Sequence, residues 1–481
     1  MGIIANLLAG FALAQSSLFS PATAVTNPVV SIHYGKIQGT RSDYVSGVNV
    51  FKGIRFAEST AGSGRWKKAP SPSNWTGAGS AGSSIEGDED CLFLNVWTPE
   101  NFTETSAYPV YFWIYGGRFT GGSGSDLTYE GSGLAKQGIV VVTINYRLGS
   151  LGFLAHPDLS AESAHNASGN YGLMDQIAAL HWTKENIQHF GGNNSHVVIG
   201  GQSAGAGSVL DLVYSPEAAG LFVGSVAESG ARAPHDPMTG KAQGASYLSS
   251  FNITNLSQAR NASVATILGT GSISQMDTLF EGTPFEKVSA YMEPPLFRPT
   301  IDGYILPRTY EATLSGNNRD ESGASPNPGV NLTTYNTSNS AIFGPMGLED
   351  TFVSLFPAST DLEASNQTNN FYRNQSLISA WTWANTWLSG GAKSNVYTYY
   401  WTHAPPGQNS GAFHGSEISY AFHNMPWGTT LMGVMLNWTS TDYDIANTMS
   451  AYWINFIRTG DPNGGNLTRY LVAQQYLCDE Y

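Results

Sequence analysis

The first half of the chain alternates between continuous apolar runs and amphipathic segments. Apolar, β-branched runs at 110–115 and 139–144 are typical of strands covered on both faces of a largely parallel sheet. Apolar positions at helical spacing predict a helix over 172–186, and a further strand at 197–199 follows it. This alternation predicts an α/β fold with a large, mostly parallel central sheet flanked by helices on both faces.

Shorter patterns complete the outline of the fold. They predict strands at 29–32, 36–39, 92–97 and 396–401, helices at 371–388 and 446–458, a mixed, mostly helical region at 252–310, and a polar loop at 316–339. No repeat or linker interrupts the chain, so we expect a single domain over 28–465. Residues 466–481 are set apart as an atypical tail.

The N-terminal segment and the glycosylation sequons both favour the secretory pathway. Residues 1–14 are mostly apolar and end in Ala12-Leu13-Ala14, which predicts a signal peptide cleaved near Ala14. The run is too short to span a bilayer of ~30 Å, so we expect no stable membrane span. The Asn-X-Ser/Thr sequons stand at Asn74, Asn101, Asn166, Asn193, Asn252, Asn255, Asn261, Asn331, Asn336, Asn366, Asn374, Asn437 and Asn466. We expect a secreted protein with N-linked glycans.

Charge and cysteine content narrow the classes of partner. The 481 residues carry 22 Lys and Arg against 36 Asp and Glu, a formal net charge of −14, without a basic run. This balance disfavours nucleic acid and anionic membrane surfaces as partners. The sequence has two cysteines, Cys91 and Cys478, and it does not decide whether a disulfide joins them. Neither their number nor their spacing indicates a metal site. We expect no metal and no cofactor, and the sequence does not indicate an oligomeric state.

The stretch 201–205 (GQSAG) matches G-x-S-x-G and stands between a predicted strand and a predicted helix. A sharp turn from strand to helix needs glycine on both sides of the serine, because a Cβ there would collide with neighbouring backbone. Such a turn lifts the serine oxygen above the sheet at a helix N-terminus. Ser203 is therefore the candidate nucleophile.

A serine nucleophile needs a base and an orienting carboxylate. In the chain order of the α/β-hydrolase fold both follow the serine, which leaves His403, His414 and His423 as candidate bases. We favour His414 because Gly411 and Gly415 flank its loop. For the acid, the pair Asp320-Glu321 stands in the turn-like stretch 316–323.

The candidate oxyanion hole follows the strand that ends near residue 114. Gly116 and Gly117 make a turn there, and backbone N–H groups of this turn, with that of Ala204, are expected to face a developing oxyanion.

Together these segments resemble the type-B carboxylesterase/lipase family of the α/β-hydrolase fold, which includes cholinesterases and fungal lipases. The resemblance covers roughly residues 28–465. It rests on the stretches 51–56 (FKGIRF), 89–97 (EDCLFLNVW), 115–119 (YGGRF), 145–149 (NYRLG), 169–176 (GNYGLMDQ), 190–192 (FGG), 201–205 (GQSAG), 228–230 (ESG), 320–321 (DE) and 414–417 (HGSE).

The resemblance implies roles for particular residues. Ser203 is implied as nucleophile, Glu321 as triad acid and His414 as base. The implied oxyanion donors are Gly117, Arg118 and Ala204; the implied supporting residues are Gly116, Gln202, Ser229 and Glu417; and the implied structural ion pairs are Arg55 with Glu89 and Arg147 with Asp175.

Three departures from the family pattern bear on substrate choice. Arg118 replaces the third oxyanion glycine; a backbone donor survives this change if its φ stays negative, and we expect poor activity on esters of bulky tertiary alcohols. Gln202 replaces a residue that is often Glu, which removes an anion beside the site. The short stretch 75–91 lacks the first cysteine of the family's loop disulfide and the tryptophan that binds choline in cholinesterases, and it disfavours both a choline substrate and a long lipase-type lid.

We therefore expect a secreted serine carboxylic-ester hydrolase that acts on a small-molecule ester through an acyl-enzyme. One alternative is a lipase acting on water-insoluble acylglycerols. Another, from a different class, is a non-catalytic, cholinesterase-like adhesion protein. The short stretch 75–91 argues against the first, and the filled Ser, Glu and His positions argue against the second.

Overall fold

The computed structural model of the chain describes most of the expected domain. The described residues are 27–76, 78–80, 88–230, 237–269, 295–307, 316–321, 324–325, 329–389, 394–425, 436–464 and 467. The expected signal peptide, Cys478 and nearly all of the expected tail lie outside them.

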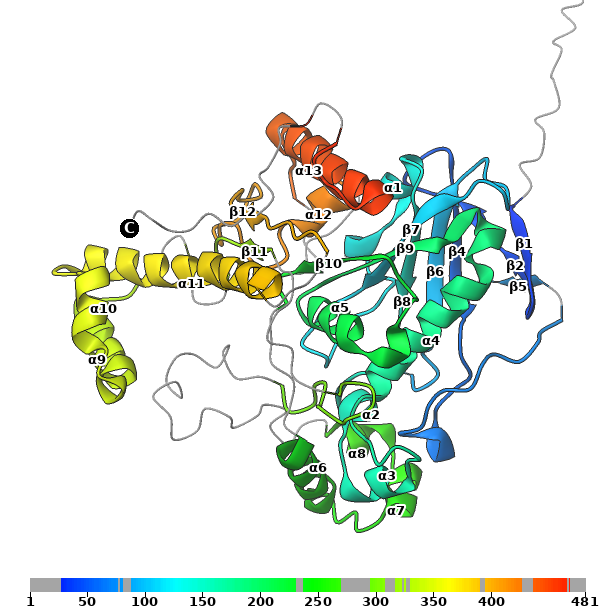
Figure 1. Ribbon diagram of the computed structural model, residues 1–481, viewed down its shortest axis with the longest axis horizontal. Helices are drawn as coiled ribbons and strands as arrows, with labels where there is room; N and C mark the ends of the chain where they lie inside the picture. Colours follow the sequence, from blue (N-terminus) through cyan, green and yellow to red (C-terminus); the bar gives the residue numbers. More distant parts are fainter. Residues whose placement is uncertain are drawn as a thin grey trace, which may run out of the picture.

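A seven-stranded mixed sheet forms the centre of the described part of the molecule (Figure 1). Its strands, in spatial order, are β10 (Gly224–Glu228), β9 (Gly192–Gln202), β7 (Tyr108–Ile114), β8 (Val140–Ile144), β6 (Phe93–Pro99), β4 (Val48–Arg55) and β3 (Thr40–Arg41). The pairings from β10 to β8 are parallel, and those from β8 to β3 are antiparallel. The predicted α/β fold is confirmed, with the parallel pairings on the side of the sheet that carries the candidate site.

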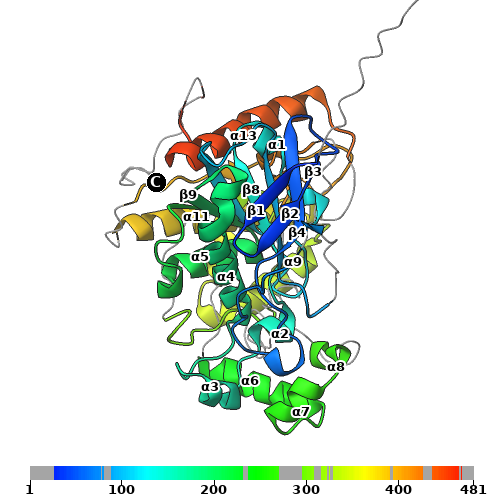
Figure 2. The same ribbon diagram turned by 90° about the vertical axis from the view of Figure 1, so that its right-hand side faces the viewer.

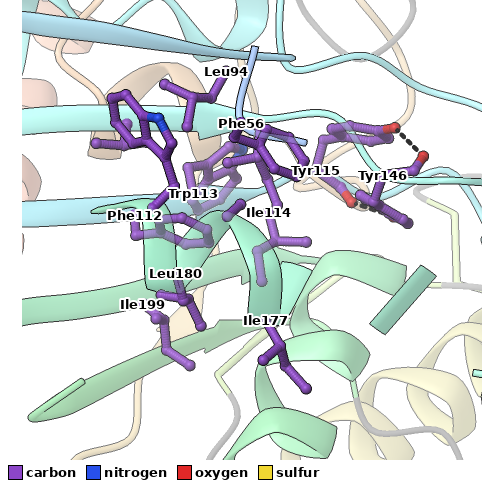
Figure 3. Packing of buried hydrophobic residues seen from close by; sticks show 14 of the residues in the cluster. Phe56, Leu94, Phe112, Trp113, Ile114, Tyr115, Tyr146, Ile177, Leu180 and Ile199 are labelled. Carbon is purple, nitrogen blue, oxygen red and sulfur yellow. Dashed lines mark hydrogen bonds between the residues drawn. The ribbon is translucent and has the colours of Figure 1, made fainter. Parts of the chain in front are cut away.

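The central strands are buried because both faces of the sheet are covered. Every residue of β8 is buried, as its β-branched and mostly apolar sequence predicts. Figure 3 shows Phe112 and Ile114 of β7 close to Ile177 and Leu180, which come from a helix on one face. The rings of Tyr115 and Tyr146 stack at 4.6 Å between centroids, and the Tyr146 hydroxyl donates to the Tyr115 carbonyl oxygen at 2.9 Å. This packing fixes the end of β7, where the candidate oxyanion turn begins.

Helices cover both faces of the sheet (Figures 1 and 2). Their bounds are α1 (Ser132–Lys136), α2 (Gly149–Phe153), α3 (Pro157–Glu162), α4 (Tyr171–Asn186), α5 (Ala204–Tyr214), α6 (Pro237–Ser250), α7 (Leu256–Asn261), α8 (Val264–Leu268), α9 (Leu332–Phe343), α10 (Glu349–Leu355), α11 (Asp361–Ser389), α12 (Ile418–Ala421) and α13 (Ser440–Thr459). Helices α4 and α5 lie on one face, α1 and α13 on the other, and α9 to α11 project away from the sheet.

Two small sheets complete the strands of the described residues. One is β1 (Val29–Ile32), β2 (Gly35–Gln38) and β5 (Ala78–Ser80), and the other is β11 (Asn317–Asn318) and β12 (Tyr400–Trp401). A parallel bridge between Glu228 and Gly316 connects the second sheet to the end of β10. The acid-bearing segment is thereby placed beside the parallel half of the central sheet.

The prediction of a polar loop at 316–339 is wrong over its last part, where α9 begins at Leu332. Asn331 caps this helix by accepting a hydrogen bond from the Thr334 N–H at 2.8 Å. Tyr335 is buried and packs against Phe352 of α10. The Asn and Thr residues that indicate a loop are here the start of a capped helix.

Candidate active site

Ser203 occupies a strained turn between the end of β9 and the start of α5. Its backbone has φ +56° and ψ −119°, a region that residues other than glycine rarely adopt. Its N–H donates to the Glu228 carbonyl oxygen at 2.8 Å, which ties the turn to β10. A Cβ on Gly205 would lie 2.0 Å from the Ile114 carbonyl oxygen, and one on Gly201 would lie 2.5 Å from the Gly205 carbonyl carbon. The two glycines of the motif are therefore required by close backbone contact.

The candidate base and acid meet through a short hydrogen bond. The Nδ1 atom of His414 lies 2.6 Å from Oε2 of Glu321, although 93 residues separate them in sequence. The two other candidate histidines have different partners: His403 Nε2 lies 2.7 Å from Asp442 Oδ1, and His423 Nε2 lies 2.8 Å from Asn447 Oδ1. The structure thus brings His414, and neither His403 nor His423, to the candidate acid.

The carboxylate of Glu321 is held in its charged form. Burial alone would raise its pKa, but the charge and hydrogen bond of His414, the Ser229 hydroxyl and the Asn318 N–H together lower the pKa below its usual value. A carboxylate that stays ionised fixes the Nδ1–H tautomer of His414 and stabilises a positive charge on the ring.

Asn318, which the sequence analysis did not single out, connects both sides of this pair. Its backbone N–H donates to Glu321 Oε1 at 3.0 Å. Its side-chain amide donates to the carbonyl oxygen of Phe413, next to His414, at 2.7 Å, and to Glu417 Oε2 at 2.6 Å. One residue therefore positions the acid and the loop that carries the base. An asparagine in a polar stretch gave no pattern by which to find it.

Asp320, beside the candidate acid, holds the same loop through charge. Its carboxylate is fully buried and accepts a hydrogen bond from the Ala412 N–H at 2.7 Å. Arg319 and Arg373 contact it at 3.0 Å and 2.6 Å. Burial raises its pKa, but these hydrogen bonds and charges outweigh burial and lower the pKa overall. Arg373 belongs to α11, so this carboxylate connects a distant helix to the base.

The turn after β7 packs directly against the candidate nucleophile. A Cβ on Gly116 would lie 2.5 Å from the Gln202 carbonyl oxygen and 2.9 Å from Ser203 Cβ. The Gly117 carbonyl oxygen accepts the N–H groups of Thr120 and Gly121 at 3.0 Å and 3.1 Å, which closes the turn. The backbone of Gly117, the candidate donor, is thereby held beside Ser203.

The condition of a negative φ at Arg118 is not met. Its φ is +59°, and that of Phe119 is +62°. The physical reason is that hydrogen bonds close the turn on both sides of Arg118. The Gly117 carbonyl oxygen accepts from residues of the same turn, and the Phe119 carbonyl oxygen accepts the Gly149 N–H at 2.6 Å. Arg118 therefore keeps the left-handed backbone that glycine adopts without steric cost.

Two further carboxyl groups are buried behind the candidate triad. Glu228 accepts a hydrogen bond from Trp453 Nε1 at 2.9 Å, and its pKa is raised well above the usual value by burial and by the charge of Glu417. Burial likewise raises the pKa of Glu417 to about 7. Ser229 follows Glu228 with φ +57°, and its N–H donates to the Gly316 carbonyl oxygen at 2.8 Å. The stretch 228–230 thus carries the acid-bearing segment against the parallel sheet.

The expected ion pair of Arg55 with Glu89 is wrong. Arg55 forms a two-armed pair with Asp90 at 2.6 Å and 2.7 Å. Glu89 pairs instead with Arg65, also through two hydrogen bonds at 2.6 Å and 2.7 Å. The reason is burial. The Arg65 side chain is only 5% exposed and also donates to the carbonyl oxygens of Ala259 and Ala262. Glu89, which is more buried than Asp90, neutralises this buried charge.

The other expected pair is present. Arg147 contacts Asp175 through two hydrogen bonds at 2.7 Å, and both side chains are buried. Among the described residues no group of three or more His, Cys, Asp or Glu side chains is arranged to hold a metal ion. No helix in that part of the chain is long and apolar enough to cross a bilayer.

Comparison with known proteins assigns the chain to a family. The model of the carboxylesterase family matches residues 26–382 and 368–477. The chain is 31% identical to a fumonisin B1 esterase of Sphingopyxis macrogoltabida over 91% of its length and 83% of the relative. It is 30% identical to a para-nitrobenzyl esterase of Bacillus subtilis, over 91% of each chain. A solved structure of a PNB esterase superposes with a TM-score of 0.71, at 28% identity and over 92% of this chain and 93% of that one. The chain belongs to the carboxylesterase family, and it is a carboxylic-ester hydrolase with the α/β-hydrolase fold.

Proposed function

We propose that the chain hydrolyses esters through a Ser203–His414–Glu321 triad and an acyl-enzyme. The observation that carries this proposal is the 2.6 Å contact between His414 and Glu321. The other ring nitrogen of His414 lies 3.0 Å from the side chain of Gln202, the residue that precedes the strained Ser203. A free serine hydroxyl is a weak nucleophile, and an oriented imidazole is the group that activates it.

The reaction proceeds in two matched halves. Ser203 Oγ attacks the ester carbonyl carbon while His414 Nε2 takes the hydroxyl proton, and the carbonyl oxygen becomes an oxyanion. The N–H groups of Gly117 and Ala204 stabilise that oxyanion, whereas Arg118, with a φ of +59°, does not meet the condition set for it as a third donor. His414 returns the proton to the departing alcohol, and the acyl group stays on Ser203. Water then repeats the sequence, releasing the acid and restoring the enzyme.

The test is turnover of p-nitrophenyl acetate by the wild-type protein and by Ser203→Ala. Serine removal is expected to lower kcat by at least about 10³-fold without changing the unfolding temperature, because residual catalysis comes from the oxyanion hole and binding alone. Ser208→Ala, a change in the adjoining helix α5, is the matched control and is expected to retain turnover. Unchanged turnover in Ser203→Ala would overturn the assignment.

The proposed substrates are small, water-soluble esters. The names of relatives mention fumonisin B1, para-nitrobenzyl, acylcarnitine and cocaine, and most of them are named as esterases. Comparison of p-nitrophenyl acetate, butyrate and palmitate tests this proposal, with short-chain preference as the expected result. Preference for palmitate, with a jump in rate above the micellar threshold, would favour a lipase instead.

Secretion and N-glycosylation are also proposed. Exposed sequon asparagines support this: Asn74, Asn101, Asn166, Asn252, Asn255, Asn261, Asn331, Asn336, Asn366, Asn374 and Asn437 are exposed, and Asn193 is half-buried. Asn466 lies outside the described residues. Expression in a eukaryotic secretory host is expected to give protein in the medium with Gln15 as first residue and a mass that falls on glycosidase treatment. Intracellular protein of unchanged mass would contradict both proposals.

A further inference from the structure

The side chain of Gln202 lies against the reactive nitrogen of the candidate base. Gln202 is the last residue of β9 and is fully buried. Its Nε2 atom lies 3.0 Å from Nε2 of His414. Its Oε1 atom has no hydrogen-bond partner within the described structure. One end of this amide therefore contacts the atom that must accept the Ser203 proton, and the other end is unused.

The tautomer of His414 decides what this contact does. Because Nδ1 faces the Glu321 carboxylate at 2.6 Å, Nδ1 carries the proton of the neutral ring and Nε2 presents a single lone pair. The Gln202 N–H donates to that lone pair in the resting enzyme. The same lone pair must accept the Ser203 proton, so the amide contact must open before proton transfer, and the resulting Nε2–H then faces the departing alcohol. The amide therefore holds the neutral ring and can release it, whereas a carboxylate would hold the protonated ring.

We propose that Gln202 is a positioning residue of the proposed hydrolysis, which holds the neutral His414 ring through Nε2 in the resting enzyme and releases it when the Ser203 hydroxyl takes its place. This inference rests on the triad proposed above. It assigns a role to the amide at the position where the family often has a carboxylate.

The charged groups around His414 give the inference its measurable consequence. Glu321 contacts Nδ1, and the buried Glu417, three residues further along, acts on the ring by charge. Burial, together with the charge of Glu417, raises the pKa of Glu228 well above its usual value. A carboxylate at position 202 would add a charge at 3.0 Å from Nε2 and would favour the protonated ring, which cannot act as a base.

The experiment is the pH dependence of kcat/KM for p-nitrophenyl acetate in wild type, Gln202→Glu and Gln202→Met. The glutamate is expected to raise the pKa of the acid limb by about one unit or more, since an opposite charge this close shifts a pKa by about 1–3 units. Relative to its own plateau, its activity at pH 6 should then fall about tenfold. Methionine removes the donor without adding charge. We therefore expect Gln202→Met to lower the plateau kcat and to shift the pKa of the acid limb less than Gln202→Glu does.

Gln176 provides the matched control. It is also fully buried, donates its Nε2–H to Ser208 Oγ at 2.9 Å, and leaves its Oε1 without a partner in the described structure. Gln176→Glu is expected to leave the pKa of the acid limb at its wild-type value. If Gln176→Glu does not fold, Gln176→Met serves as the control variant. A control that moved the limb as far as Gln202→Glu would overturn the inference, because the shift would then be a general effect of burying a carboxylate.

A second readout separates this inference from the hydrolysis itself. In a Ser203→Ala background, an NMR titration of ¹⁵N-labelled His414 reports the ring pKa without turnover. Addition of Gln202→Glu is expected to raise that pKa. An unchanged ring pKa and acid limb would overturn the role of Gln202 and leave the triad intact, whereas full turnover in Ser203→Ala would overturn the triad itself.

Discussion

The nucleophile side and the acid–base side of the site are built in different ways. Ser203 stands between an eleven-residue strand and an eleven-residue helix. A Cβ added to either glycine of its turn would lie less than 3 Å from backbone atoms, so both positions must be glycine. The segments that carry Glu321 and His414 lie beside strands of two residues each. There Asn318 and Asp320 hold the loops by hydrogen bonds and ion pairs to distant residues. The first side depends on regular structure and close packing, and the second on polar contacts between remote segments.

This difference teaches where each side is vulnerable. A strand-to-helix turn tolerates changes of charge at a distance but no added atom at its glycines. Short segments held by a buried carboxylate tolerate small changes in volume but lose their geometry when a charge or donor is removed.

The nucleophile side is broken most severely by one methyl group. Gly205→Ala would place a Cβ 2.0 Å from the Ile114 carbonyl oxygen, so strand and helix must separate. We expect a loss of at least about 3 kcal/mol in the free energy of unfolding and no measurable esterase activity. Chemical denaturation and turnover check this result. Gly207→Ala, two residues along the same helix with its nearest neighbour at 3.5 Å, is the control and should retain both.

The acid–base side is broken by loss of charge. Asp320→Asn weakens the contacts to Arg373 and Arg319 and the anchor of the Ala412 N–H, so the His414 loop is no longer fixed. We expect kcat to fall about 100-fold through misplacement of the base, with KM much less affected. Asp350→Asn, an exposed carboxylate on α10, should match the wild type. Equal kcat values for wild type and Asp320→Asn would show that this carboxylate does not position the base.

Stability against pH sharpens the comparison, because it reports the buried carboxyls behind the triad. The pKa of Glu417 is about 7 in the folded protein against about 4.3 in an unfolded chain. The folded state therefore binds this proton more tightly, and stability falls as pH rises from about 4.3 to about 7. Glu417→Gln should make this decline smaller by a few kcal/mol, as measured by denaturation at pH 5 and pH 8, while the raised pKa of Glu228 leaves part of the decline in place. Glu185→Gln, an exposed change on α4, should keep the wild-type decline.

The smallest expected effect concerns the strained oxyanion turn. Arg118→Gly relieves a left-handed backbone that costs a side-chain-bearing residue about 1 kcal/mol, so we expect a gain in unfolding free energy of about that size. Because the glycine also widens the turn beside Ser203, activity on tert-butyl acetate relative to ethyl acetate should rise. A loss of stability in Arg118→Gly would mean that the arginine side chain contributes more than its backbone costs.

The sequence predicted the side that depends on local pattern. The β-branched runs, the GQSAG turn and the Gly116–Gly117 turn each combine neighbouring residues whose spacing has a direct geometric meaning. Ser203 and the strands β7, β8 and β9 could be located from such patterns alone, whereas β10 was not predicted. Helix α9 was missed because its capping asparagine also fits a polar loop.

The contacts of the acid–base side could not be predicted in the same way. Asn318 reaches Phe413 and Glu417 across almost a hundred positions, and Arg373 reaches Asp320 across more than fifty. No local pattern specifies such pairings. The pairing of Glu89 with Arg65, and not with Arg55 as predicted, was missed for the same reason. Arg65 is buried by contacts near residue 260, far away in the sequence. Chain order, the loop glycines and the resemblance to a family together indicated Glu321 and His414, but not the residues that hold them.

The most direct test of the proposed triad is covalent labelling of the native protein with a fluorophosphonate, followed by mass-spectrometric mapping of the modified peptide. Ser203 is expected to carry the label, and His414→Gln and Glu321→Gln are expected to slow labelling strongly while the protein stays folded. Rapid labelling at a serine other than Ser203, or labelling of Ser203 at the wild-type rate in both variants, would contradict a nucleophile activated by His414 and Glu321.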